Sequence, residues 1–343
     1  MSESASEGPI REPERPDPEP EGSTRESDGP GSQAADQEVD AGDPLLSVVV
    51  TLVDGGDVMR RFLDAVTNQV DPPPMDVVLP YDDSVAEVAD LQDDYPNVRF
   101  LALGEITPER PLDTAAGQHE LYDRRRAAGL AAARGDLVAI LEDRGAPRPN
   151  WARTVVRLHE QSYGVVGGAI ECAPGDTLNW AFYVCDFGRY GLPFESGPVT
   201  WVSDVNVTYK RAILEETRHL WKERFREPVV HWALLERGET LYLSSEAVVE
   251  HKRPSTTLGV LLPERFHWGR LFGHIRAMHM PASKRAVYSL AGPFIPPMLL
   301  VRHGLTQLRK GNLGRYLRAA PFAAILLVAW TAGEVWGTVT GRP

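Results

Sequence analysis

Uninterrupted runs of apolar, largely β-branched residues most constrain what this chain can fold into. The first run, LLSVVVTLV at 45–53, has no polar alternation and suits a strand buried on both faces, as in a parallel sheet. Helical patterns separate this run from the next ones, and such alternation predicts an α/β fold with a mostly parallel sheet flanked by helices. The further predicted strands are 75–84, 97–103, 136–143 and 164–170.

The clearest helical pattern follows the first strand. In DGGDVMRRFLDAVTNQ, Met59, Phe62, Leu63 and Val66 fall at helical spacing, so one face of this helix is predicted to pack against the sheet. A later helix is predicted to stop at Gly135, which can serve as a C-terminal cap. The predicted helices are 54–69, 85–94, 119–135 and 150–161.

Charge is spread unevenly along the 343 residues. Residues 1–44 carry 13 acidic and 3 basic side chains among Pro, Glu, Gly and Ser, and so little apolar surface predicts a disordered tail. From residue 251 onward, 13 Lys and Arg face only Glu264 and Glu334, which indicates a polyanionic neighbour for this third of the chain. The part between is nearly neutral, so nucleic-acid binding is not expected.

Cysteine usage points to a reducing compartment. Cys172 and Cys185 stand in no CxxC or metal-ligand spacing, so neither a zinc site nor a disulfide framework is expected. No apolar segment follows a basic start at the N-terminus, so no secretory signal is expected.

Acidic residues follow two of the predicted strands at the point where each leaves the core. Glu142 and Asp143 end LVAILED, and Asp82 and Asp83 end VVLPYDD. Because ligands of such sheets bind at the carboxyl ends of the strands, these side chains are candidates for holding a hard cation and, through it, a phosphate. The ordinary alternative is that they cap the helices that follow.

The stretch from 46 to about 251 resembles the family 2 glycosyltransferases of the GT-A fold. SVVVTLV is similar to the first nucleotide-binding strand, and VVLPYDDS to the strand whose final Asp contacts the nucleobase. RRRAAGLAAARGDLVAILEDRGAPRPNW resembles the arginine-containing helix and the acidic metal-binding motif. VVGGAI and VSDVNVTYKRAIL resemble the acceptor side, and FREPVVHWALLERGETLYLSSEAVVEHKR the last catalytic stretch.

The resemblance implies roles for individual residues. Glu227 would be the base that deprotonates an acceptor hydroxyl, and Asp143 would hold Mg²⁺ or Mn²⁺ against the donor diphosphate. His251 would contact the phosphates; alternatively it is a core histidine at a strand end. The aromatic stretch 179–194 would wall the acceptor site, or form a core helix with a loop. The expected nucleotide-sugar contacts are Asp82, Asp83, Arg126, Glu142, Arg144, His251 and Arg270, and the expected acceptor contacts are Trp180, Asp186, Asn206 and Arg211.

Two departures from the family pattern keep alternatives open. Arg144 stands where the family has the second Asp of Asp-x-Asp, so it either pairs with phosphate in place of a cation or weakens metal binding. Pro228 stands where the catalytic stretch has Asp, which leaves a catalytically silent scaffold or glycan-binding protein as the alternative function. A nucleotidyltransferase is disfavoured because the loop with Gly55 and Gly56 lacks a matching Lys.

The C-terminal end predicts membrane association. Residues 286–301 read as an interfacial helix and 319–341 as a marginal spanning or re-entrant helix, with a soluble helical cap as the alternative. The basic residues between them suit anionic headgroups and place the catalytic domain on the cytoplasmic side. These basic residues are Arg302, Arg309, Lys310, Arg315 and Arg318.

Together these features predict three parts: a tail (1–44), a GT-A domain (45–252) and a basic, membrane-associating region (253–343). The predicted activity is transfer of a sugar from a nucleotide-diphosphate sugar, UDP-linked by the family's habit, with inversion and metal assistance. The predicted acceptor is lipid-linked or a cell-envelope glycan.

Overall fold

The computed structural model describes residues 43–112, 114–278 and 280–342, so the predicted disordered tail lies outside it except for residues 43 and 44. Within the described residues, each predicted apolar run forms a strand of one nine-stranded sheet. The strands are β1 (Leu46–Thr51), β2 (Met75–Tyr81), β3 (Val98–Ala102), β4 (Leu137–Glu142), β5 (Gly145–Pro147), β6 (Val165–Cys172), β7 (Gly197–Val199), β8 (Asn206–Lys210) and β9 (Leu241–His251).

The sheet is parallel where the predicted strands lie. Its order is β3-β2-β1-β4-β8-β6-β9-β5, with β7 on β9; β3, β2, β1 and β4 run parallel, as do β6 and β9. β8 is antiparallel to both of its neighbours, and the short strands β5 and β7 pair antiparallel at the far edge. This arrangement confirms the predicted mostly parallel α/β sheet flanked by helices.

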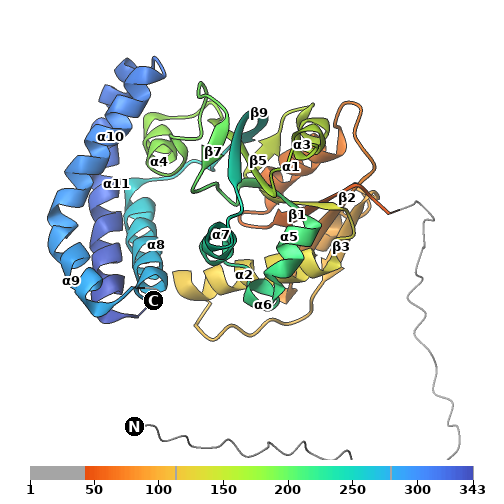
Figure 1. Ribbon diagram of the computed structural model, residues 1–343, viewed down its shortest axis with the longest axis horizontal. Helices are drawn as coiled ribbons and strands as arrows, with labels where there is room; N and C mark the ends of the chain where they lie inside the picture. Colours follow the sequence, from red (N-terminus) through yellow and green to blue (C-terminus); the bar gives the residue numbers. More distant parts are fainter. Residues whose placement is uncertain (1–42, 113, 279, 343) are drawn as a thin grey trace, which may run out of the picture. The chain divides into compact units, whose positions relative to one another are not determined.

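Helices cover both faces of the sheet and continue as a helical layer at the C-terminal end (Figure 1). The helices of the sheet region are α1 (Gly56–Thr67), the 3₁₀ helix η1 (Asp83–Leu91), α2 (Ala115–Ala132), α3 (Trp151–His159), α4 (Thr177–Phe187), α5 (Arg211–Glu216), α6 (Arg218–Trp221) and α7 (Glu227–Glu236). The C-terminal layer comprises α8 (Leu258–Met278), α9 (Ala282–Ala291), η2 (Gly292–Phe294), α10 (Ile295–Arg309) and α11 (Leu313–Thr340).

Some predicted boundaries were wrong by a few residues. The second strand ends at Tyr81 because Asp82 caps the following 3₁₀ helix, its side chain accepting from the Ser84 amide at 2.8 Å. The helix predicted to stop at Gly135 ends at Ala132, where Ala133 turns into extended backbone. Capping by Asp82, which a hydrophobic pattern does not report, sets the first of these two ends.

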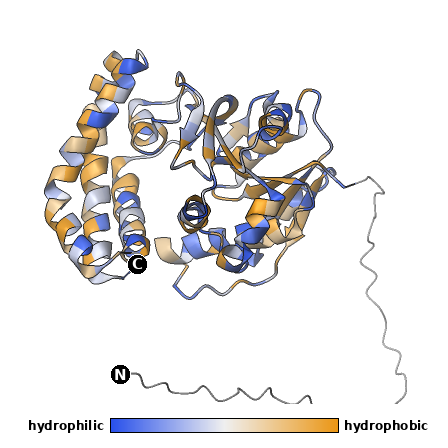
Figure 2. Ribbon diagram, in the orientation of Figure 1, coloured by the Kyte–Doolittle hydropathy of each residue, from blue (hydrophilic) through white to orange (hydrophobic). Residues whose placement is uncertain are grey.

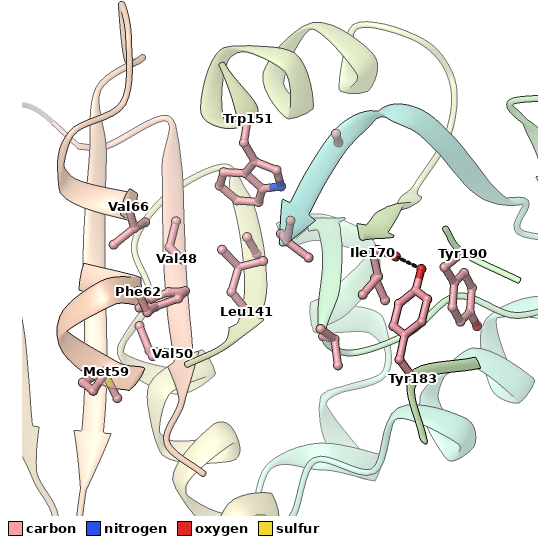
Figure 3. Packing of buried hydrophobic residues seen from close by; sticks show 14 of the residues in the cluster. Val48, Val50, Met59, Phe62, Val66, Leu141, Trp151, Ile170, Tyr183 and Tyr190 are labelled. Carbon is pink, nitrogen blue, oxygen red and sulfur yellow. Dashed lines mark hydrogen bonds between the residues drawn. The ribbon is translucent and has the colours of Figure 1, made fainter. Parts of the chain in front are cut away.

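The core confirms the amphipathic interpretation of α1. Met59, Phe62, Leu63 and Val66 are buried, and Figure 3 shows three of them lying beside Val48 and Val50 of β1. On the other side of the same view, the Tyr183 hydroxyl donates to the Ile170 carbonyl at 2.8 Å, which ties α4 to β6 (Figure 3). A second buried cluster, including Leu130, Trp221 and Phe225, fills the opposite face of the sheet.

Four glycines set the packing of α8 on α11. A Cβ atom at Gly269 would lie 2.1 Å from the Trp330 carbonyl oxygen, and one at Gly333 would lie 1.9 Å from that of Phe266. Gly273 and Gly337 are in similarly close contact with the opposing backbone. This small-xxx-small pairing brings the two helices into backbone contact, and α8 in turn lies beside α2 (Figure 1).

Candidate active site

A cavity of about 300 Å³ lies at the edge of the sheet where β1 and β4 end. Thr51 and Glu142 are register partners there, so the carboxyl ends of the two strands meet as the strand-end argument expects. The opposite wall comes from α8 and from Trp330 of α11. Of the residues predicted for the site, six line this cavity: Arg126, Glu142, Arg144, Asp186, Glu227 and His251.

Glu227 is a buried carboxylate at the first position of α7, where Pro228 follows as the second helical residue. One helical turn on, His231 Nδ1 lies 3.3 Å from Glu227 Oε1, and His231 Nε2 lies 2.8 Å from the Tyr209 hydroxyl. Burial raises the pKa of Glu227. The contact with His231 lowers this pKa, and the negative charge of Asp204 raises it further, so that the net shift is upward. A carboxylate held in this way can accept a proton from a hydroxyl in the cavity.

Arg126 brings a guanidinium to the same cavity from α2. It ion-pairs with Asp204 at 2.8 Å, and its Nε donates to Thr51 Oγ1 at 2.8 Å. The side chain is therefore fixed from both β1 and the turn before β8. Arg126 and Asp204 together give the cavity a positive and a negative group beside Glu227.

Glu142 and Asp143 face different ways although they are adjacent. Glu142 lines the cavity, and burial raises its pKa to about 7, with Arg144 lowering it and Asp143 raising it. Asp143 is fully buried, and its Oδ2 accepts from the amides of Val53, Asp54 and Gly55 at 3.1, 2.9 and 2.9 Å. Asp143 thus holds the β1–α1 loop through a nest of backbone amides rather than lining the cavity.

Arg144 extends along the edge of the cavity and is clamped by Asp54. Its Nε lies 2.7 Å from Asp54 Oδ2 and its Nη2 2.5 Å from Oδ1, a bidentate pair that fixes the plane of the guanidinium. Its Nη1 is 3.9 Å from Glu142 Oε1. A cation bound by Glu142 would therefore lie next to a fixed positive charge.

Asp82 lies at the end of β2 and outside the residues that line the cavity. It is buried and ion-paired with Arg125 at 3.0 Å, while Asp83, at the start of η1, is exposed. Arg125 also donates to the Ser84 hydroxyl at 3.0 Å. The structure therefore brings Asp82, but not Asp83, into a buried charge network at the end of β2.

The predicted acceptor residues lie in different places. Asp186 lines the cavity and pairs with Arg265 of α8 at 2.5 Å, whereas Trp180 is buried in the core with Arg315 over its ring. Asn206 cross-links the sheet, since its amide donates to the carbonyls of Ala169 and Ala247 and its oxygen accepts from Trp151. The remaining residues, Arg211, which donates to the Gly135 carbonyl, and Arg270, lie outside the cavity lining.

Sequence reasoning missed several residues of the cavity. Asp204 lies two residues before β8, inside a stretch that resembles the acceptor side of the family. His231 stands one helical turn after Glu227, so helical spacing could have indicated it. The cavity residues of α8 are harder to predict from the sequence, because charged residues interrupt the apolar pattern of this helix. The wall residues are Trp268, Leu271, Phe272 and Ile275, with Arg265 beside them.

No protein-family model matches this sequence, and no curated protein matches it either. Among solved structures, the chain resembles that of S. aureus TarS with a TM-score of 0.43 and 12% identity, over 80% of this chain and 55% of that one. It also resembles S. aureus TarS 1-349 in complex with UDP-GlcNAc, with a TM-score of 0.47 and 13% identity, over 80% of this chain and 90% of that one. The chain therefore spans about half the length of the first of these structures.

Proposed function

We propose that this protein is a glycosyltransferase that moves a sugar from a nucleotide-diphosphate sugar to an acceptor hydroxyl. The observation that carries the proposal is the meeting of a buried base, Glu227, with the guanidiniums of Arg126 and Arg144 in one cavity at the carboxyl edge of the sheet. A base and fixed positive charges are what such a transfer needs, because a hydroxyl loses a proton while a diphosphate leaves.

The roles follow from where each group lies. Glu227, positioned by His231, takes the proton of the acceptor hydroxyl, and direct attack on the sugar then inverts its configuration. Arg144 and Arg126 face the leaving diphosphate, whose charge grows as the bond to the sugar breaks. Asp82 at the end of β2 lies on the side of the sheet proposed for the nucleoside, for which UDP is the first choice to test.

The fit of Mg²⁺ or Mn²⁺ is poor at Asp143. One oxygen of Asp143 is occupied by three amides, and the whole side chain is closed off from the cavity. Within residues 43–112, 114–278 and 280–342, no group of three or more His, Cys, Asp or Glu side chains is arranged to hold a metal ion. Metal assistance stays a prediction from the resemblance, and none of the steps above is routed through a cation.

For the acceptor we propose an amphiphile, either lipid-linked or a glycan of the cell envelope, met at the cytoplasmic face of a membrane. The α8 side of the cavity supports this choice, since Trp268, Leu271 and Phe272 with Trp330 add apolar surface to the cavity that Glu227 lines. Such a wall favours the apolar part of an acceptor over a second hydrophilic sugar.

The test is donor binding and turnover by the full chain. UDP and GDP are titrated by calorimetry, and release of nucleoside diphosphate is then followed from the sugar nucleotides of the base that binds. Glu227→Gln should keep donor binding and lose roughly 10²–10⁴-fold in turnover, because it removes the base. Glu236→Gln, an exposed carboxylate on the same helix, is the matched control and should change neither.

The pH profile gives an independent readout. Because burial raises the pKa of Glu227, turnover should rise with pH through a point above the usual pKa of a glutamate. Failure of every nucleotide to bind, with or without Mn²⁺, would sink the proposal and favour a catalytically silent scaffold.

A further inference from the structure

The outer surface of the C-terminal layer carries a stripe of exposed apolar side chains along α9, η2 and α10. These residues recur every three or four positions, so they share one face of a nearly continuous helix. Each side chain is between 50% and 79% exposed. The stripe includes Val287, Leu290, Phe294, Met298, Val301 and Leu305.

The neighbouring helix α11 extends this apolar surface. Leu317, Val328, Trp336 and Val339 are each more than half exposed along it, and α10 and α11 pack side by side, joined by the Tyr316 hydroxyl donating to the Leu300 carbonyl. Figure 2 shows hydrophobic residues recurring along both helices. Monomeric proteins rarely leave so long an apolar surface to water.

Charge identifies what covers this surface. Between residues 282 and 340 the sequence has a single acidic residue, Glu334, and it is buried against Arg276 at 2.7 Å. The exposed charges of this segment are therefore basic, and Arg302 and Arg309 lie in the helix that bears the stripe. An apolar face bordered by cations matches a bilayer surface with anionic headgroups.

The packing of α11 decides between lying on the bilayer and crossing it. α11 is long and apolar enough to span a membrane. Its inner face, however, is in backbone contact with α8 at Gly333 and Gly337, and α8 carries Glu264, Arg265 and Arg276. α11 could cross a bilayer only by leaving α8, which is a wall of the cavity, or by taking those charges with it.

We infer that the C-terminal layer docks on an anionic membrane as a monotopic, in-plane element, with the α9–α10 stripe immersed and α11 retained in the layer. The cavity wall formed by α8 then lies on the inner side of the same layer that contacts lipid. The inference rests on the proposed membrane location but not on the proposed chemistry. It narrows the predicted spanning or re-entrant helix at 319–341 to an in-plane one.

Vesicle flotation of the full chain tests the docking. Binding is expected to vesicles of phosphatidylcholine mixed with phosphatidylglycerol, and weaker binding to phosphatidylcholine alone. The double variant Phe294→Glu/Val301→Glu should lose roughly tenfold or more in binding, since two large apolar side chains leave the lipid. Val70→Glu, at a 48% exposed position in the sheet region, is the control and should bind as wild type.

Two outcomes would overturn the inference at this stage. One is the absence of binding to either vesicle. The other is a dimer in light scattering that the Phe294→Glu/Val301→Glu variant dissociates while lipid binding is absent, which would assign the stripe to a second copy of the chain. Nucleotide titration of the same variant without vesicles should match wild type, so a failure of docking is separable from a failure of the proposed function.

Cysteine labelling shows whether α11 lies in the plane of the membrane or spans it. With Cys172→Ser and Cys185→Ser as background, Asn312→Cys and Thr340→Cys place one thiol before α11 and one at its end. In sealed membrane preparations an impermeant maleimide should reach both positions from the same side. Labelling from opposite sides would show that α11 crosses the bilayer and would overturn the in-plane assignment.

Discussion

The sheet edge and the C-terminal layer handle charge and apolar surface in opposite ways. At the sheet edge, charged groups are buried with ion-pair partners, such as Arg125 with Asp82 and Arg126 with the half-buried Asp204, while the apolar core is closed. In the layer, apolar side chains from Val287 to Leu305 are exposed, while the segment's single carboxylate, Glu334, is buried. The first region suits chemistry on a polar ligand next to water, and the second suits a surrounding that is not water.

The two regions meet at α8, which belongs to the layer by packing and to the site by its contacts. One face lines the cavity with Trp268 and Phe272, and another packs on α11 through Gly269 and Gly273. The layer therefore forms part of the wall of the candidate site, and damage to its packing should reach the cavity.

Gly333→Ala is expected to have the largest effect, because it disturbs the contact that joins the C-terminal layer to the site. A Cβ there would lie 1.9 Å from the Phe266 carbonyl oxygen, so α8 and α11 must separate, at a cost of about 3 kcal/mol in the free energy of unfolding. Gly314→Ala, in the same helix with nothing within 4 Å, should be neutral or slightly stabilising. Chemical denaturation measures both, and donor turnover should fall only for Gly333→Ala. Equal stability of the two variants would contradict the backbone contact.

Asp143→Asn tests whether the buried carboxylate serves the loop or a metal. Removing the charge weakens three bonds from the loop amides, so we expect about 2 kcal/mol of destabilisation and faster hydrogen exchange at residues 53–55. Asp57→Asn, at an exposed position in the first turn of α1, is the control. A change in Mn²⁺ affinity with unaltered exchange would instead restore Asp143 as a metal ligand.

The sequence predicted the features that depend on hydrophobic periodicity and on where strands end. The apolar runs became strands, and Glu142 lies beside Thr51 because the parallel strands β4 and β1 end at one edge. Arg126 of α2 and Glu227 of α7, both expected at the site, line the same cavity. Sequence reasoning missed what depends on the path of a distant loop: nothing in the spacing of Glu142 and Asp143 tells which one faces the cavity. Asn206 illustrates the same limit, since its bonds to Trp151, Ala169 and Ala247 join segments far apart in the chain.

The C-terminal segment was harder still to interpret from sequence. A run such as AAPFAAILLVAWTAG reads alike whether its inner face packs on lipid or on another helix. What separates the two cases is the partner, Gly269 and Gly273 on α8, which lie about sixty residues earlier in the chain. Composition could predict affinity for a membrane, but not the way the helix meets it.

Mild acid is expected to have the smallest effect, a loss of stability at two buried histidines of the sheet region. Burial lowers the pKa of His159 to about 4; burial, and then the charges of Arg144, Arg253 and Arg61, lower that of His251 to about 3. Both folded-state values lie below the unfolded value, so the unfolded chain binds more protons, and the stability these groups contribute is lost as pH falls below about 6.5. At pH 5.5 each accounts for about 1.4 kcal/mol of that loss.

The measurement is urea denaturation of the wild type, His159→Gln and His251→Gln at pH 7.5 and 5.5. Each variant should show a smaller drop in unfolding free energy between the two pH values, because it no longer carries a group that must stay neutral in the fold. His219→Gln, at an exposed position on α6, should show the wild-type drop. If all three variants lose as much unfolding free energy between pH 7.5 and 5.5 as the wild type, then acid destabilises the protein at groups other than His159 and His251.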